Sequence, residues 1–210
     1  MSALNVRPMK TADLDDVIAL HLEGFPGFFL SILGPRFLKL LYSEILKRPD
    51  HVAMVAVDPT RQVTGFVAGV AEQSHFYSHL IRRRSFAFAV ASLSAVIRNP
   101  RILPRLFRSL KYPRQSRTAS AQALLMSIAV KPDMAGKGVG RLLVTAFLEA
   151  MSRKGAAAVS LTTDRDSNDR TNRFYQELGF RIDRVFVTAE GRRMNEYKIE
   201  IPVVSSGLKY

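Results

Sequence analysis

A glycine-rich segment, Gly136 to Gly140, is the part of the chain whose residue types and spacing point most directly to chemistry. Glycines alternate there at positions 136, 138 and 140, after an apolar run and before an amphipathic helical pattern. Glycine lets the backbone come close to a bulky anion, and the free N–H groups at a helix start favour negative charge. Lys137 and Arg141 add positive charge at the same point. The segment therefore predicts a pyrophosphate-binding site.

The spacing separates this segment from two other phosphate-binding loops. The glycines follow G-x-G-x-G, whereas a dinucleotide fingerprint needs G-x-G-x-x-G and a P-loop needs Gly-Lys-Ser/Thr. A tight strand-to-helix turn without a ligand remains the alternative for the loop taken alone. A second segment, Asn168 to Phe180, favours a ligand, because it adds an independent motif: Asn-Asp-Arg-Thr-Asn-Arg-Phe-Tyr-Gln-Glu-Leu-Gly-Phe.

Together the two segments resemble the GNAT superfamily of acetyl-CoA-dependent N-acetyltransferases. In that family a strand ending in Val-x-Pro leads into [R/Q]-x-x-G-x-G, and an Asn and a helix ending Phe/Leu-Tyr-x-x-Leu-Gly-Phe follow later. The order and spacing match from Leu124 to Phe180. Ala135 stands where the family usually has Arg or Gln, and we expect the loop N–H groups, helped by Lys137, to hold the pyrophosphate.

The resemblance implies an activity and a set of site residues. The activity is transfer of an acetyl group from acetyl-CoA to a primary amine of a small or nucleotide-linked acceptor, directly and through a tetrahedral intermediate. The backbone around Ser127, Ile128 and Val130 would bind the pantetheine arm, and an N–H there could stabilise the oxyanion. The predicted donor-binding residues are Ser127, Ile128, Val130, Ala135, Gly136, Lys137, Gly138, Val139, Gly140, Arg141 and Asn168.

Two catalytic residues are predicted, Tyr175 and Glu72. Tyr175 matches the family tyrosine proposed to protonate the leaving CoA thiolate. Glu72 is the first candidate for the general base that the amine needs, with Glu23 second and His75 third. Each prediction has a plainer alternative: Ile128 and Val130 as core strand residues, Tyr175 as a packing residue, Asn168 as a helix N-cap, and each base as an ordinary polar residue.

The acceptor site of the family is built from the first two helices and nearby loops. The segment from Gly24 to Gly34, with Phe25, Phe28 and Phe29, would then supply apolar walls. No acidic or histidine cluster has metal-ligand spacing, so no metal is expected. No nucleophile-elbow sequence supports a serine triad either.

Hydrophobic periodicity and turn signals predict the helices and strands that position these residues. Their order predicts an α/β (α+β) fold, with a mixed, largely antiparallel central sheet of about six to seven strands flanked by helices. We expect a single domain over residues 1–210, with a helical insertion at about 76–117. The predicted strands are 4–8, 51–57, 62–71, 120–130, 157–162, 180–188 and 193–201, and the predicted helices include 36–47, 138–154 and 168–178.

The net charge of +13 is concentrated in the insertion. No Asp or Glu occurs from Gln73 to Pro132, and residues 79–117 hold ten Lys or Arg. Such a segment predicts an anionic partner, here an anionic membrane surface contacted by the amphipathic pattern from Arg101 to Tyr112. The alternatives are a packed lid with solvated arginines and a site for a phosphorylated acceptor. Nucleic acid is disfavoured, because no reading motif is present.

The apolar run from Phe86 to Ile97 is expected to be buried against the body of the protein or a partner, and it could form a homo-oligomer interface. It is too short to span a bilayer. The chain has no cysteine, which excludes disulfides and thiolate sites and fits a reducing cytoplasm. Residues 1–10 lack a signal-peptide pattern. We therefore expect a cytoplasmic protein, with a position peripheral to the inner membrane face as the alternative.

Overall fold

The computed structural model describes residues 4–71 and 122–203, together with residues 84, 86–93, 95–97 and 100 of the segment between them. Seven strands form one sheet in the order β1-β2-β3-β4-β5-β7-β6. All neighbouring strands are antiparallel except β4 and β5. The predicted fold class is confirmed. The strands are β1 (Asn5–Pro8), β2 (Val52–Val57), β3 (Val63–Val70), β4 (Gln122–Val130), β5 (Ala158–Asp164), β6 (Arg181–Val187) and β7 (Arg193–Glu200).

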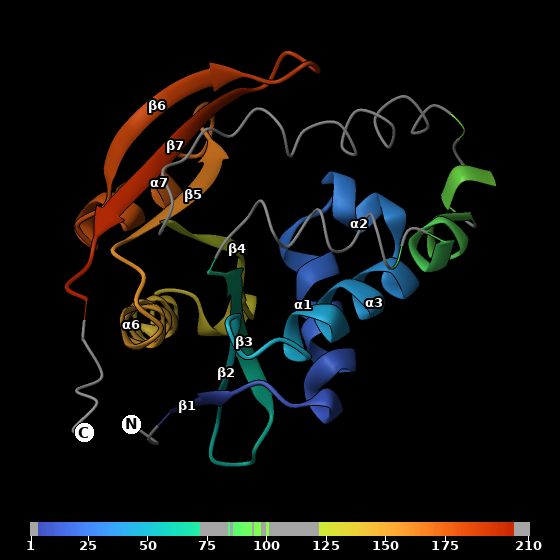
Figure 1. The fold of residues 1–210 in the computed structure, drawn as a ribbon, viewed down its shortest axis with the longest axis horizontal. Coiled ribbons are helices and arrows are strands. Elements are labelled where there is room, and N and C mark those ends of the chain that lie inside the picture. The colour runs from blue at the N-terminus through green and yellow to red at the C-terminus, as the bar shows by residue number, and fades with distance from the viewer. Residues whose placement is uncertain are drawn as a thin grey trace, which may run out of the picture.

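Helices cover both faces of this sheet (Figure 1). On one face lie α1 (Leu14–Gly24), the short α2 (Phe29–Leu33) and α3 (Pro35–Leu46), and on the other lie α6 (Val139–Arg153) and α7 (Asp169–Glu177). Two hydrophobic cores result, one on each face of the sheet. The strands of the middle of the sheet are buried on both sides, so β3 reads as a continuous run of buried residues.

A close approach between β3, β4 and α6 depends on Gly69. A Cβ at this position would lie 2.2 Å from the carbonyl oxygen of Leu124 and 2.5 Å from the ring of Phe147. No larger residue fits there without displacing backbone or core. The same place carries a register shift, because Ala68 pairs with Ser127 while Gly69 pairs with Leu125. Met126 is therefore the extra residue of a β-bulge in β4.

Most of the predicted insertion lies outside the described residues, as does the amphipathic pattern from Arg101 to Tyr112. The described residues 86–93 and 95–97 are helical. The expectation that this run is buried holds for one face only: Ser92 and Ala95 are buried, whereas Phe86 and Ile97 are largely exposed. Within the described part of the chain, no helix is long and apolar enough to cross a bilayer.

Candidate active site

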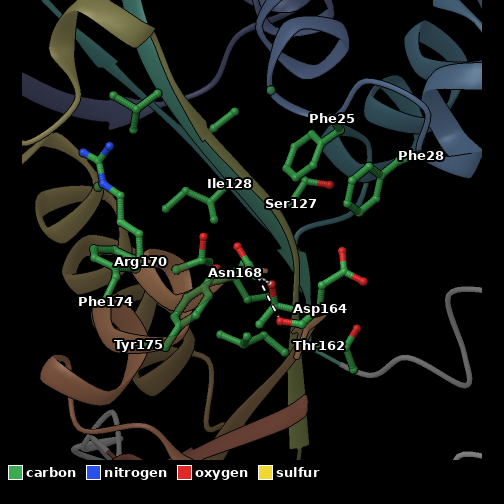
Figure 2. A pocket seen from close by; sticks show the side chains of 18 of the residues that line it. Phe25, Phe28, Ser127, Ile128, Thr162, Asp164, Asn168, Arg170, Phe174 and Tyr175 are labelled. Carbon is green, nitrogen blue, oxygen red and sulfur yellow. Dashed lines mark hydrogen bonds between the residues drawn. The ribbon is translucent and has the colours of Figure 1, made fainter. Parts of the chain in front are cut away.

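The two parallel strands separate beyond a short paired stretch. β4 pairs with β5 only from Gln122 to Leu124 and from Ala158 to Ser160, yet β4 continues to Val130 and β5 to Asp164. Beyond Leu124, the backbone N–H and C=O groups on the facing edges of β4 and β5 do not pair with the other strand. A cleft of about 1160 Å³ opens at this separation and continues from the glycine-rich loop to α1 and α2 (Figure 2).

The glycine-rich loop forms one end of the cleft. Gly136 and Gly138 have φ values of +78° and +83°, in the left-handed region that favours glycine. Gly138 is the N-cap of α6, so the N–H groups of Val139, Gly140 and Arg141 begin the helix without intrahelical acceptors. Six of the seven predicted loop residues line the cleft: Ala135, Gly136, Gly138, Val139, Gly140 and Arg141.

Lys137 is the loop residue that does not line the cleft. Its side chain is exposed, and its Nζ lies 3.9 Å from the sulfur of Met134. A different cation is close to the loop. The Arg170 guanidinium lies 4.0 Å from the position that a Cβ of Gly136 would take, and Arg170 lines the cleft. The sequence motif did not single out Arg170, because its proximity to Gly136 depends on how α7 packs beside the loop.

The bulge in β4 changes which way its side chains face. Leu125 and Ile128 belong to the core beneath α6, whereas Met126 packs against the core beneath α1 and α3. Ser127, which follows the bulge, also faces α3, because its hydroxyl lies beside the phenol of Tyr42. The predicted pantetheine-binding residues Ser127, Ile128 and Val130 all line the cleft.

A buried polar chain runs behind Ser127. The hydroxyl of Tyr42 lies 2.7 Å from Nδ1 of His21, and the Nε2 of His21 has no hydrogen-bond partner among the described residues. Burial lowers the pKa of His21 to about 4, so the imidazole is neutral at ordinary pH. Burial also raises the pKa of Tyr42 above its usual value. His21 lines the cleft beneath Phe25, whose ring centroid is 4.8 Å from the imidazole.

Tyr175 lines the cleft from α7 and is 5% exposed. Its ring packs against Phe174, Phe180 and Tyr197, as the packing alternative predicts. Among the described residues, no hydrogen bond engages its hydroxyl. Burial raises the pKa of Tyr175, so the phenol stays protonated and has a proton to donate. The packing role and the proposed proton-donor role are therefore compatible.

Asn168 is the N-cap residue of α7 by position, but its side chain does not cap the helix. Its Nδ2 instead donates to Thr163 Oγ1 at 2.8 Å and to the Asp164 carbonyl at 3.1 Å, as Figure 2 shows. Asn172 donates to the same carbonyl and accepts from Tyr197 and Asn195. These bonds fix the end of β5 beside α7. Asn168 therefore stands at the N-cap position of α7, as the alternative predicts, but its side-chain amide holds the end of β5 and does not cap the helix.

The opposite end of the cleft combines aromatic rings with an ion pair. Phe25 and Phe28 contact edge to face at 5.5 Å, and both line the cleft as expected (Figure 2). The Arg192 guanidinium lies 4.6 Å from the centroid of Phe28 and donates to Asp164 at 3.0 and 2.5 Å. The sequence did not predict Asp164 or Arg192 as site residues, since they are 28 positions apart and meet only through the pairing of β5 with β7.

The candidate bases are placed differently. Glu72 and His75 lie outside the described residues. Glu23 is exposed on α1 and does not line the cleft. The described carboxylates that do line it are Asp164, Asp166, Asp169 and Glu177. No group of three or more metal-binding side chains occurs within the described ranges.

A mixed sheet split between two parallel strands, with a glycine-rich helix start at one end of the split, defines a class of acyl-CoA-dependent transferases. A family model described as the acetyltransferase (GNAT) family matches residues 19–180. The chain belongs to this family, and it is an acyltransferase enzyme.

Solved structures with the same fold span nearly the whole chain. A phosphinothricin acetyltransferase from Sinorhizobium meliloti, in complex with AcCoA, is 14% identical with a TM-score of 0.64, covering 96% of this chain and 90% of that one. The ribosomal-protein-S18-alanine N-acetyltransferase from Escherichia coli is 15% identical with a TM-score of 0.59, covering 99% and 100%. Ard1 from Thermoplasma volcanium is 16% identical with a TM-score of 0.61, covering 95% and 98%. No curated protein matches the chain significantly.

Proposed function

We propose that this protein transfers an acetyl group from acetyl-CoA directly to a primary amine of a small or nucleotide-linked acceptor. The observation that carries the proposal is the continuous cleft between the unpaired edges of β4 and β5, which joins a pyrophosphate-type loop to a separate aromatic end. A donor that enters at the glycine-rich loop and an amine that enters at the end lined by Phe25 and Phe28 would meet at the bulge of β4. This geometry allows transfer without a covalent enzyme intermediate.

The donor half would bind through backbone and through arginine. The free N–H groups at the start of α6 suit a pyrophosphate, and the edge of β4 from Ser127 to Val130 suits the amides of a pantetheine arm. Ala135 has no polar side chain where the family usually has Arg or Gln. We propose that Arg170, the cation beside Gly136, supplies the phosphate contact in its place. A guanidinium can bind phosphate oxygens through two parallel hydrogen bonds.

The reaction forms a C–N bond and breaks a C–S bond. The amine nitrogen attacks the thioester carbonyl carbon, and a backbone N–H of β4 stabilises the oxyanion of the tetrahedral intermediate. Collapse of that intermediate expels the CoA thiolate, which takes a proton from the hydroxyl of Tyr175. A general base removes a proton from the attacking amine, and Glu72 remains the first candidate for that role.

The acceptor half would recognise an ammonium group beside an apolar or flat moiety. Asp164 is a carboxylate at the aromatic end of the cleft, and its charge is held in place by Arg192 stacked on Phe28. We propose that Asp164 binds the acceptor ammonium before deprotonation. An alternative is the same reaction carried out at a membrane surface, which the basic segment of residues 79–117 favours.

The test is a screen of amine acceptors with release of the CoA thiol as the readout. The panel should contain free amino acids, peptides with a free N-terminus, polyamines and nucleotide-linked amino sugars, each with acetyl-CoA and with longer acyl-CoA donors. The proposal expects thiol release above background hydrolysis with at least one amine. Thiol release that never depends on an amine, together with no binding of acetyl-CoA, would overturn it.

The variant Asp164→Asn tests the acceptor half. It should lower kcat/KM for the amine on the order of tenfold through a higher acceptor KM, because a charge-assisted hydrogen bond is lost. Binding of acetyl-CoA should not change. Asp166→Asn is the matched control, because Asp166 also lines the cleft but pairs with the exposed Arg193. Equal effects of the two variants would contradict the assignment of Asp164.

A further inference from the structure

The helical residues between β3 and β4 present two unlike faces. On the inner face, Phe88 stacks edge to face on Phe37 of α3 at 4.9 Å, and Ala95 packs with Leu33 of α2. On the outer face, four large apolar side chains are exposed at spacings of four, three and four residues, which places them on one side of a helix. We call them the outer stripe: Phe86 (82% exposed), Val90 (55%), Leu93 (54%) and Ile97 (72%).

The outer stripe is distinctive among the described residues. It contains Phe86 and Ile97, the two most exposed large apolar side chains found there. Single exposed apolar residues are ordinary, whereas a contiguous row marks an interaction surface. The helix is also fixed to the domain, because Arg84 lies 3.2 Å from the buried carboxylate of Glu44 on α3. The stripe is therefore presented outward by a helix that is itself anchored.

The chemistry of the surrounding sequence indicates what covers the stripe. Arg82, Arg83 and Arg84 come just before it, and Arg98 and Arg101 come just after it. No acidic residue occurs anywhere from Gln73 to Pro132. An apolar row flanked by arginines suits the surface of an anionic bilayer, where apolar side chains enter the acyl boundary and cations remain among the headgroups.

The charge near the stripe also favours an anionic bilayer over a second copy of the chain as the partner. Two copies meeting through the outer stripe would bring together the arginines that adjoin it in each sequence, Arg82, Arg83, Arg98 and Arg101, and no acidic residue between Gln73 and Pro132 offsets them. A bilayer with anionic lipids is attracted by the same charge, because its surface potential is negative. A nucleic acid would match the charge but would leave the apolar row uncovered.

We propose that the outer stripe docks the protein on an anionic lipid bilayer, with Phe86, Val90, Leu93 and Ile97 inserted at the headgroup boundary. This inference does not rest on the proposed acyl transfer. None of the four side chains lines the cleft, so docking and acetyl-CoA binding can be tested apart.

The experiment is co-sedimentation of the full chain with vesicles of phosphatidylcholine alone and of phosphatidylcholine mixed with phosphatidylglycerol. The test variant carries Phe86→Ser, Val90→Ser, Leu93→Ser and Ile97→Ser together. The matched control carries Ile182→Ser, Val185→Ser and Val187→Ser, which remove exposed apolar side chains from β6 instead. A cooperative thermal unfolding transition near that of the unaltered protein confirms that each variant is folded.

The unaltered protein and the β6 control should sediment with the phosphatidylglycerol vesicles, and the stripe variant should bind them at least about tenfold more weakly. Binding should fall as salt is raised, because anionic headgroups supply part of the attraction. Equal binding by the stripe variant and the unaltered protein would overturn the proposal. So would a lack of binding by the unaltered protein to the phosphatidylglycerol vesicles. A dimer, measured by light scattering, that the stripe variant converts to a monomer would then identify a second copy as the occupant of the stripe.

Discussion

At the scale of single residues, the cleft holds a protonated phenol and a guanidinium at positions where the proposed reaction would develop or bind negative charge. Tyr175 is held by three aromatic rings, with its hydroxyl unbonded among the described residues. Arg170 lies beside the loop glycine Gly136. Neither position needs its functional atom for the fold, so substitutions there separate chemistry from stability.

Tyr175→Phe should lower kcat on the order of a hundredfold, because a positioned proton donor contributes about that much. Its melting temperature and its KM for acetyl-CoA should stay close to those of the unaltered protein, since the hydroxyl has no described partner. The measurements are steady-state kinetics by thiol release and a thermal unfolding curve.

Tyr197→Phe is the matched control for Tyr175→Phe. The hydroxyl of Tyr197 donates to Asn172 at 3.0 Å in the core, so its loss should cost about 1 kcal/mol of stability with kcat largely kept. A normal kcat in Tyr175→Phe would remove the proton-donor role from Tyr175.

Arg170→Ala should raise KM for acetyl-CoA on the order of tenfold, because a charge-assisted contact to phosphate is lost. The kcat at saturating donor should be nearly unchanged. Arg181→Ala, in the edge strand β6, is the control, because Arg181 does not line the cleft. If both variants bind acetyl-CoA as the unaltered protein does, the cation that replaces the family side chain at position 135 lies elsewhere.

At the scale of elements, a buried chain of polar side chains ties α1 and α3 to the bulge of β4. His21 contributes from α1, Tyr42 from α3 and Ser127 from β4. The elements join next to Phe25, at the end of the cleft that we propose for the acceptor. The neutral imidazole of His21 is part of this joint, so its protonation should loosen the packing of α1.

Folding stability should fall as the pH drops from about 6.5 toward 4, by about 3 kcal/mol from His21. The sign follows from the depressed pKa: the unfolded chain binds the proton at higher pH than the folded protein, so acid favours unfolding. The measurement is the free energy of unfolding by urea across this pH range.

His21→Asn is the comparison for the pH experiment, since its amide can still bond to Tyr42. The difference between the two pH profiles isolates the imidazole from the carboxylates whose pKa values are also lowered, such as Asp13 beside Arg7. Parallel profiles would show that His21 titrates normally in the folded protein.

At the scale of the whole molecule, the cleft is assembled from segments that are far apart in the chain. The loop follows β4, Arg170 and Tyr175 come from α7, Phe25 and Phe28 from the α1–α2 connection, and Arg192 from the turn before β7. A ligand that fills the cleft must therefore stabilise the folded state as a unit, because it contacts elements from both faces of the sheet.

Acetyl-CoA at about a hundredfold above its Kd should stabilise the fold by about 2.7 kcal/mol and raise the melting temperature by roughly 5–10 °C. Inorganic tripolyphosphate is the control, because the net charge of +13 could bind any polyanion. An equal shift with tripolyphosphate would mean that the polyanionic part of the donor accounts for the stabilisation, and that the pantetheine arm and the edge of β4 add nothing to it.

The sequence by itself determined the order of the elements, the mixed and largely antiparallel sheet, and the glycine loop before α6. Those features are encoded in contiguous residues, through hydrophobic periodicity and through backbone conformations that glycine favours, as at Gly136 and Gly138. The predicted strands match the observed ones to within two residues at each end. The short helix α2 was missed, since five residues carry too little periodicity.

Only the tertiary structure decided which side chains meet. Arg170 reaches Gly136 through the packing of α7 beside the loop, and Asp164 meets Arg192 and Phe28 through the pairing of β5 with β7. The apolar run from Phe86 to Ile97 gave no sign of its two faces, because nearly every position in it is apolar or small. Packing against α2 and α3 chose the inner face and left the outer stripe exposed. Contacts between distant segments depend on the burial of surfaces that neither segment specifies alone.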